Sequence, residues 1–198
     1  MSNEMLWAGE FGNNYTARNE MFPYVSRWKF LKSVCEDYII KSVLEVGCNT
    51  GFNLGIIKEH LASPHNIWGC DVNEYNIQQM RLRWPDIQSV YASGFDLPFK
   101  DDYFDLVFTS GVLIHQKPSE VESMMQEIIR VSAKYVIAIE YFEEVFRDVN
   151  YRAGKGTAFC GPYGDIYEKR YGLKQIASGH LDKEDGWDDC TYWIFRKR

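Results

Sequence analysis

Short apolar runs alternate with helix-spaced apolar positions along most of the chain. Runs rich in β-branched and aromatic residues predict strands over residues 42–46, 66–71, 89–92, 105–109 and 135–139. Apolar residues at intervals of three and four predict helices over residues 23–38, directly after Gly51, over 74–84 and over 119–131. Because strands and helices alternate, we expect a mostly parallel sheet with helices on both faces.

Polar residues mark the starts of two of these helices. Asn73 is a good N-cap for residues 74–84, and Ser119 with Glu122 has the spacing of a capping box. After Tyr141 the pattern changes, because residues 151–164 are rich in glycine and aromatic side chains and predict a loop. This loop forms either part of a substrate-binding wall or an irregular connection. Closing strands are predicted over residues 173–177 and 191–195.

Composition narrows the class of protein. A length of 198 residues is enough for one substantial core, and a net charge of −6 argues against a nucleic-acid partner. The five cysteines show no zinc-like spacing, so we expect neither a disulfide framework nor a metal. The start of the chain lacks a leader pattern and no apolar run reaches bilayer length. A cytoplasmic protein without a membrane partner is expected.

The stretch from Ser42 to Phe52 is a strand, a glycine loop and the start of a helix. Gly47 and Gly51 bound the loop, and glycine lets a ligand approach the main chain. The helix that follows offers unpaired N–H groups and a partial positive charge, which suits a nucleotide-like ligand. A dinucleotide site would need glycine where this chain has Asn49 and Phe52, so NAD is disfavoured. The alternative is a tight turn of any α/β protein.

Three blocks together resemble the class I S-adenosylmethionine (SAM) methyltransferases. The loop resembles their E/D-x-G-x-G-x-G signature, with Asn49 replacing the middle glycine, and Asp71 follows at the end of the next strand. Residues 97–107, read as LPFKDDYFDLV, and the later VLIH segment that ends at His115 resemble a further block of that family. The resemblance covers about residues 42–141. It implies a Rossmann-like fold with a seven-stranded sheet, and an antiparallel strand near the C-terminus.

A smaller family resembles the whole chain more closely, namely the methylases associated with pseudaminic acid biosynthesis. The aromatic start from Trp7 to Asn19, the GCNTG loop and the GVLIH segment carry this resemblance. It implies a bacterial surface-glycan sugar or nucleotide sugar as the acceptor. The alternatives are a methyltransferase acting on a protein or nucleic-acid side chain, and a SAM-binding protein without catalysis.

The resemblance assigns a cofactor site for SAM and its product S-adenosylhomocysteine (SAH). Asp71 is expected to accept hydrogen bonds from the ribose hydroxyls. The acidic residue that accepts from the adenine amino group in the family falls on Ser93, a neutral and weaker acceptor. Ser93→Asp is therefore expected to keep or raise affinity. The complete predicted cofactor set is Tyr15, Arg18, Glu45, Gly47, Cys48, Asn49, Gly51, Asp71, Val72, Ser93, Gly94, Phe95 and Ser110.

His115 is the predicted catalytic base, because an acceptor hydroxyl or amine must lose a proton during methyl transfer. Turnover would then rise with pH as this histidine titrates. The alternative is a histidine that only caps the loop after the fourth strand. The predicted acceptor-binding residues are Phe11, Tyr141, Tyr151, Arg152 and His180.

The predicted organisation is a single methyltransferase domain in three parts. Residues 1–40 form an N-terminal lid and helix, with Tyr15 and Arg18 near the methionine carboxylate, or else an arm whose aromatic side chains merely cover the core. Residues 41–141 form the SAM-binding core, and residues 142–198 form the acceptor-side loop and closing strands. We expect a small-molecule acceptor with O- or N-methylation, and a monomer or homodimer.

Overall fold

One seven-stranded sheet organises the computed structural model, which describes residues 2–19, 24–60 and 65–197. Its strands follow the order β3-β2-β1-β4-β5-β9-β8. They are β1 (Ser42–Val46), β2 (Asn66–Asp71), β3 (Gln88–Tyr91), β4 (Phe104–Ser110), β5 (Ser132–Glu140), β8 (Lys174–Leu181) and β9 (Cys190–Arg196). Strands β1 to β5 pair in parallel, and β9 runs antiparallel to both β5 and β8. The predicted fold class is confirmed.

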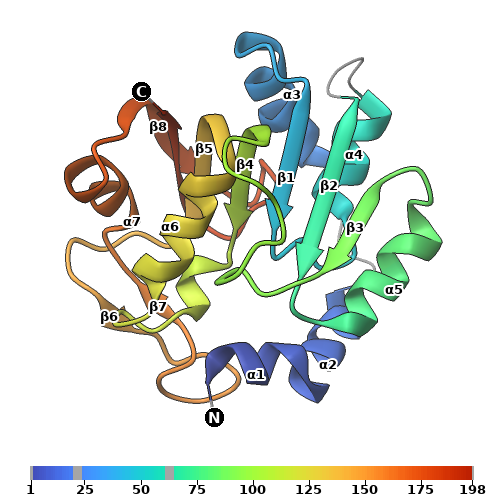
Figure 1. Cartoon of the computed structure of the whole chain (residues 1–198). Coiled ribbons are helices and arrows are strands. Elements are labelled where there is room, and N and C mark those ends of the chain that lie inside the picture. Colours follow the sequence, from blue (N-terminus) through green and yellow to red (C-terminus); the bar gives the residue numbers. More distant parts are fainter. Residues whose placement is uncertain (1, 20–23, 61–64, 198) are drawn as a thin grey trace.

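Helices cover both faces of the sheet (Figure 1). The long helices are α3 (Trp28–Asp37), α4 (Phe52–His60), α5 (Glu74–Arg83) and α6 (Val121–Val131). Buried apolar side chains of α3, α4 and α5 form one core layer with one face of the sheet, and those of α6 form a second layer with the other. Strand β1 lies between the layers, so the residues from Val43 to Val46 are all buried rather than alternately buried and exposed.

The parallel register brings the ends of distant strands together. Val46 at the end of β1 pairs with Cys70 of β2 on one side and with Thr109 of β4 on the other. The segments that follow these strands, which include Gly47 and Ser110, therefore start at the same edge of the sheet. Ligands of open α/β sheets bind outside this carboxyl edge.

Two further helices, α1 (Asn3–Ala8) and α2 (Glu10–Asn19), lie across this carboxyl edge (Figure 1). The sequence gives no clean helical period here, so these helices were not predicted from it. The predicted helix over residues 23–38 is instead a short 3₁₀ turn, η1 (Tyr24–Arg27), followed by α3, and Pro23 lies outside the described residues. Asn73 does cap α5, since its side chain accepts from the backbone N–H of Asn76.

The predicted capping box before α6 does not form. Helix α6 begins at Val121, and its N-cap residue Glu120 makes no side-chain capping bond. The N–H groups of Glu120 and Val121 donate instead to the carbonyl of Lys117, so a backbone turn takes the place of the box.

The region after β5 contains short elements beside the predicted loop. They are the hairpin β6 (Arg147–Asp148) and β7 (Phe159–Cys160), the turn α7 (Tyr163–Asp165) and one π-helical turn η3 (Ile166–Arg170). Earlier in the chain, the turn η2 (Leu113–His115) follows β4. Tyr163 and Tyr167 are fully buried in the α6 layer.

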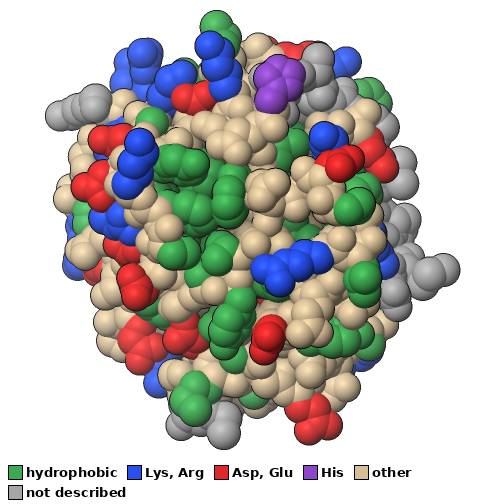
Figure 2. All heavy atoms as spheres, turned by 45° about the vertical axis from the view of Figure 1, so that its right-hand side comes forward, with side chains coloured by type: hydrophobic (Ala, Val, Ile, Leu, Met, Phe, Trp, Pro, Cys, Tyr) green, Lys and Arg blue, Asp and Glu red, His purple; other side chains and the backbone are tan. Residues whose placement is uncertain are grey.

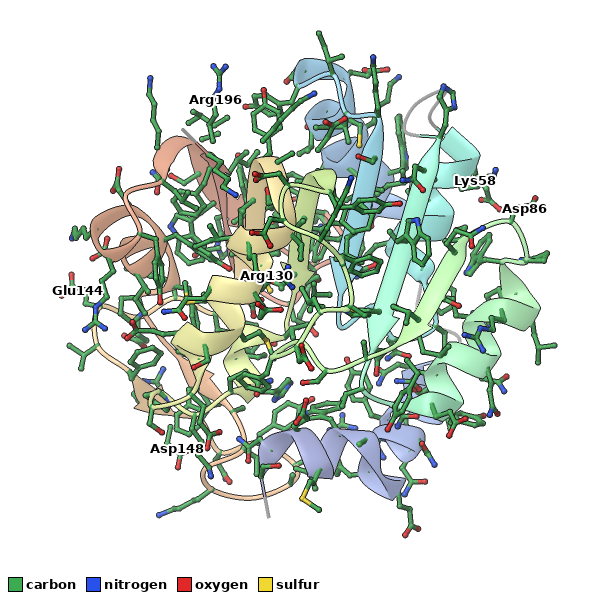
Figure 3. All side chains as sticks on the ribbon, in the orientation of Figure 1. Lys58, Asp86, Arg130, Glu144, Asp148 and Arg196 are labelled. Atoms are coloured by element: carbon green, nitrogen blue, oxygen red, sulfur yellow. The ribbon has the colours of Figure 1, made fainter. Side chains whose placement is uncertain are left out.

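Residues 92–103 connect β3 to β4 without a helix, and Arg130 of α6 fixes this connection (Figure 3). Its guanidinium donates to the carbonyls of Leu97 and Phe99 and pairs with Asp101 and Glu127.

Hydrophobic side chains gather on the face shown in Figure 2, with acidic and basic side chains scattered around them. A shallow hollow in the structure is lined by Trp68, Val90, Pro98, Phe99, Lys100 and Tyr103. No helix among the described residues has the length and apolar character needed to cross a bilayer.

Candidate functional site

A pocket of about 340 Å³ lies at the carboxyl edge of the sheet. Its floor comes from the segments after β1, β2, β3 and β4, and its cover comes from α1 and α2. The loop after β6 and the loop between β8 and β9 contribute the remaining wall. The volume falls in the range of small-molecule sites.

The glycine loop at the floor uses the left-handed backbone region three times. Gly47, Asn49 and Gly51 have φ values of 73°, 49° and 76°. A Cβ on Gly47 would lie 2.5 Å from Cγ2 of Val112, so this position excludes a side chain on packing grounds as well. Asparagine is among the few other residues that adopt this backbone region readily. Asn49 can therefore replace the middle glycine of the signature without changing the loop.

Asp71 is buried, and both of its carboxylate oxygens accept hydrogen bonds from the loops around it. Oδ2 accepts from the N–H of Asn49 at 2.8 Å, and Oδ1 accepts from the N–H of Asn73 at 2.8 Å. Burial raises the pKa of this carboxyl, and these bonds oppose the shift. Oδ1 also accepts from the side-chain amide of Asn76 at 3.5 Å, whereas Oδ2 accepts one bond. Asp71 lines the pocket, so a ligand hydroxyl can still donate to Oδ2.

Glu45 is the second buried carboxyl of the floor. Its Oε1 accepts from the side-chain amide of Asn53 at 2.7 Å, whereas its Oε2 has no hydrogen-bond partner in the structure. Burial raises its pKa to about 8, although the Asn53 bond and the charge of Arg27 act in the opposite direction. Arg27 also lines the pocket, where its guanidinium donates to the Asn53 side chain at 3.0 Å and to the Gly186 carbonyl at 2.7 Å. A cationic ligand group would find an acceptor in Glu45.

The N-terminal helices are fastened to the floor by amide side chains. The Asn73 side chain donates to the carbonyl of Trp7 at 2.9 Å and to the side chain of Asn13 at 2.8 Å. Helix α2 approaches so closely that a Cβ on Gly12 would lie 2.7 Å from this Asn73 amide. Thr16 of α2 lies 2.9 Å from the side-chain oxygen of Asn49. The two helices therefore form a cover that is fixed to the floor at several points.

Glu4 of α1 brings a third carboxylate to the pocket, at the end where β3 leads into residues 92–95. Ala92, Gly94 and Glu4 line the pocket there. The hydroxyl of Ser93 donates to the Glu4 carboxylate in a short hydrogen bond and accepts from the N–H of Phe95 at 3.0 Å. This end of the pocket therefore receives its carboxylate from α1 of the cover and not from residues 92–95 at the end of β3.

His115 also lines the pocket and is almost fully buried. Its Nδ1 lies 2.9 Å from the carbonyl of Thr157, so Nδ1 carries the proton and Nε2 keeps its lone pair. Burial lowers the pKa of His115 to about 4, and the Thr157 bond opposes the shift. The imidazole is therefore neutral at physiological pH.

Two neighbours fix the position of His115. The buried carboxyl of Glu140 accepts from the backbone N–H groups of Val112 and Ile114, both at 3.3 Å, and holds the turn that carries His115. Burial raises the pKa of Glu140 to about 7, and Glu140 does not line the pocket. Asn3 of α1 donates to the backbone carbonyl of His115 at 2.9 Å.

Aromatic rings surround the histidine. The Trp7 ring lies 4.3 Å from the His115 ring and 5.2 Å from the Tyr15 ring, and the Tyr151 ring lies 4.9 Å from His115. The loop that carries Tyr151 is held by Asp148, whose carboxylate accepts from a backbone N–H of the same loop at 2.9 Å (Figure 3). These rings make an aromatic wall around the histidine.

The structure brings most of the residues proposed from the sequence to one pocket. Those that line it are Tyr15, Glu45, Gly47, Cys48, Asn49, Asp71, Val72, Gly94, Ser110, His115, Tyr141, Tyr151 and Arg152. Six others do not line it, namely Phe11, Arg18, Gly51, Ser93, Phe95 and His180. Arg18 is exposed on α2, and the His180 side chain is 59% exposed beside Asp189.

Several lining residues were not found from the sequence. Glu4, Trp7, Arg27, Asn53, Trp187 and Asp188 line the pocket. The aromatic and glycine-rich start of the chain was the available signal for Trp7. The other residues lie in ordinary helices or loops, and only the tertiary arrangement brings them to the pocket. Among the residues that the structure describes, no His, Cys, Asp and Glu side chains gather as a metal site would require.

Comparisons with known proteins agree with this geometry. Residues 43–134 match the methyltransferase domain family. A tRNA U34 carboxymethyltransferase of Idiomarina loihiensis is 28% identical over 119 residues, which is 56% of this chain and 36% of the relative. A second such enzyme, from Syntrophotalea carbinolica, is 28% identical over 103 residues. The chain spans about a third of the length of these curated relatives.

Solved structures share the fold at low sequence identity. One is the 1,6-didemethyltoxoflavin-N1-methyltransferase of Burkholderia thailandensis with SAH, with a TM-score of 0.72 and 13% identity over 92% of this chain and 83% of that one. Another is the magnesium protoporphyrin IX methyltransferase of Synechocystis with SAM, with a TM-score of 0.72 and 12% identity over 100% and 98% of the two chains. At such identity these similarities show the fold.

Proposed function

We propose that this protein is a class I SAM-dependent methyltransferase that methylates an oxygen or nitrogen atom of a small polar acceptor, and the domain match and the fold support this. A bacterial surface-glycan sugar or nucleotide sugar is the acceptor class that the sequence resemblance suggests. The observation that carries the proposal is the single pocket beside α1 and α2, which most of the proposed cofactor residues and His115 line together.

The floor of the pocket fits SAM. The unpartnered Oε2 of Glu45 suits the cofactor's ammonium group, and Arg27 suits its carboxylate. Asp71 suits the ribose hydroxyls, and the positive φ of the glycine loop lets main chain approach the ligand. SAM supplies a methyl group on a positively charged sulfur, so the protein need not generate the electrophile. What remains for its residues is to orient the acceptor and to exclude water.

We assign the proton-accepting role to His115. Its Nδ1–H is held by the Thr157 carbonyl, which leaves the Nε2 lone pair as the acceptor for a hydroxyl or amine proton. Because its pKa is about 4, the imidazole is already neutral at pH 7 and acts as a weak base that also orients the acceptor. Tyr141, Tyr151 and Arg152 complete the acceptor side of the proposed site.

His115→Gln should lower kcat by about 10²–10⁴ while SAH affinity changes by less than about threefold. Since the pKa of His115 lies at about 4, wild-type kcat should stay level between about pH 6 and 8 and fall only as pH approaches that pKa. The sequence led us to expect a pH dependence of kcat near neutral pH, and this pH dependence is now predicted at acid pH instead. The measurement is acceptor kinetics across pH beside SAH calorimetry and thermal unfolding. An unchanged kcat in a folded variant would refute the role.

A nucleic-acid acceptor is the second candidate, because the two curated relatives are named as tRNA-modifying enzymes. The net charge of −6 disfavours it, since tRNA binding relies on a basic surface. Helices α1 and α2 also lie across the carboxyl edge, so a polymer would have to approach the pocket around them.

One experiment separates these candidates. The protein is incubated with methyl-labelled SAM and, in parallel, with a bacterial small-molecule extract and with total tRNA from the same cells. Mass spectrometry should find a small molecule that has gained one methylene, and label should stay out of tRNA. Label in tRNA alone would favour the second candidate. Asp71→Ala is the control variant, because loss of the proposed ribose contacts should remove product from either fraction.

A further inference from the structure

We propose that Glu4 of the N-terminal cover accepts the hydrogen bond from the adenine amino group of SAM. The proposal rests on the cofactor site described above and names the residue that gives this site its base specificity. It replaces the expectation that Ser93 takes this role.

Ser93 is poorly suited to hold the base alone. Its neighbours Ala92 and Gly94 line the pocket, whereas Ser93 does not. Its only proton is engaged by the Glu4 carboxylate, and the N–H of Phe95 takes one of its lone pairs. The serine hydroxyl therefore connects residues 92–95, at the end of β3, to α1.

Glu4 supplies the negative charge that residues 92–95, at the end of β3, lack. In the related methyltransferases an acidic side chain is expected at the Ser93 position, and here the carboxylate of Glu4 is bonded to that serine and faces the pocket. No other hydrogen bond to this carboxylate occurs within the described part of the chain. One of its oxygens is available to an N–H donor.

The position of Glu4 is set by the residue next to it. Asn3 is buried and donates to the carbonyls of His115 and Gly156, both at 2.9 Å. The Ser2 side chain caps the same helix through the N–H of Met5. Helix α1 is thus fixed on both sides of Glu4, so its carboxylate is preorganised for a ligand.

A carboxylate in this position selects adenine by polarity. Ionised carboxylates only accept hydrogen bonds, and the adenine amino group donates, whereas the carbonyl of hypoxanthine is an acceptor and would face repulsion. The selectivity should therefore follow the charge of Glu4 and not the shape of the pocket.

The first test moves the charge between the two positions. Calorimetry measures SAH binding to wild type, Glu4→Gln, Ser93→Asp and the double variant. We expect Glu4→Gln to weaken binding at least about fivefold, because a neutral acceptor replaces a charged one. Ser93→Asp alone should not improve binding, since two carboxylates would then face each other. The double variant carries one carboxylate at the usual family position and should return to within about threefold of wild type.

The second test changes the base. Wild type should prefer SAH over S-inosylhomocysteine at least about tenfold, and Glu4→Gln should reduce the preference to below about threefold, because an amide can turn its NH₂ toward the carbonyl. Glu10→Gln is the matched control, since Glu10 is an exposed carboxylate of α2 away from the pocket. It should bind both ligands as wild type does.

The outcomes distinguish this inference from the proposed function. If wild type binds SAH and Glu4→Gln keeps both the affinity and the base preference, the inference is wrong and the function stands. If Glu4→Gln weakens both ligands equally, Glu4 acts only by supporting the cover, and the adenine contact is wrong. If wild type does not bind SAH at all, the proposed function fails and the inference fails with it.

Discussion

Asn49 shows how a single departure from a sequence signature can leave the local structure unchanged. The signature asks for glycine, and the structure shows why, since φ at this position is 49°. Asparagine tolerates that backbone, and its side chain additionally reaches Thr16 of the cover. The departure adds a contact between the floor and the cover.

Asn49→Val should lower the free energy of unfolding by about 1–2 kcal/mol, because a β-branched side chain is strained at positive φ. Asn49→Gly should stay within about 0.5 kcal/mol of wild type, since it keeps the backbone and loses one partly buried contact. Urea unfolding of both variants measures the difference. Equal stability of the valine variant and wild type would mean that the loop does not hold this conformation in solution.

Glu45 gives a pH-linked prediction. With a pKa of about 8 the free carboxyl is mostly protonated at pH 7, and a bound ammonium group would favour its ionised form. Binding of SAH should therefore release close to one proton at pH 7, and the release should shrink as pH rises above about 8. Binding enthalpies in buffers with different ionisation enthalpies give the proton count. Glu45→Gln is the control and should show almost no release.

At the scale of elements, the α1–α2 cover is held by tertiary contacts and not by helix propensity. The stretch contains Gly9, Gly12, Asn13 and Asn14, all poor helix formers, and its apolar residues follow no helical period. The fixed points are the Asn73 and Asn3 side chains. The sequence therefore indicated a functional cover through its composition but could not show that the cover is helical.

Asn73 allows the cover to be loosened selectively. Asn73→Ser keeps an N-cap oxygen for α5 and removes the amide that donates to α1 and α2. Amides of residues 3–19 should exchange with solvent about tenfold faster, while those of α5 stay protected. Asn73→Ala removes the cap as well, so α5 should also lose protection. Unchanged exchange over residues 3–19 in the serine variant would show that other contacts hold the cover.

At the scale of the whole molecule, what could be predicted depends on how each residue reaches the pocket. The segments after β1, β2 and β4 follow apolar runs, and parallel pairing places them at one edge. The strand pattern therefore predicts that Gly47, Asp71 and His115 lie together, and the family resemblance suggested their roles. Arg27 and Trp187 enter from elements that lie far away in the sequence. The local sequence around these two residues does not indicate that they reach the pocket, because only the packed fold defines their position.

SAH at a free concentration 100 times its Kd should raise the free energy of unfolding by about 2.7 kcal/mol. Because residues of the cover and of the β8–β9 loop line the pocket, the added protection from hydrogen exchange should include residues 3–19 and Trp187. Asp71→Ala at the same ligand concentration should show a smaller gain. Stabilisation without protection of residues 3–19 would place the ligand outside the covered pocket.

Helix α1 is only six residues long, yet it carries Glu4 at one ligand subsite and Trp7 against His115 at the other. A rigid element shared by two subsites makes their occupancies interdependent, and thermodynamic linkage makes that dependence equal in both directions. If bound cofactor raises the affinity for the acceptor by some factor, bound acceptor must raise the affinity for the cofactor by the same factor. An unknown acceptor can therefore be identified without turnover, as the compound in a mixture that lowers the dissociation rate of SAH.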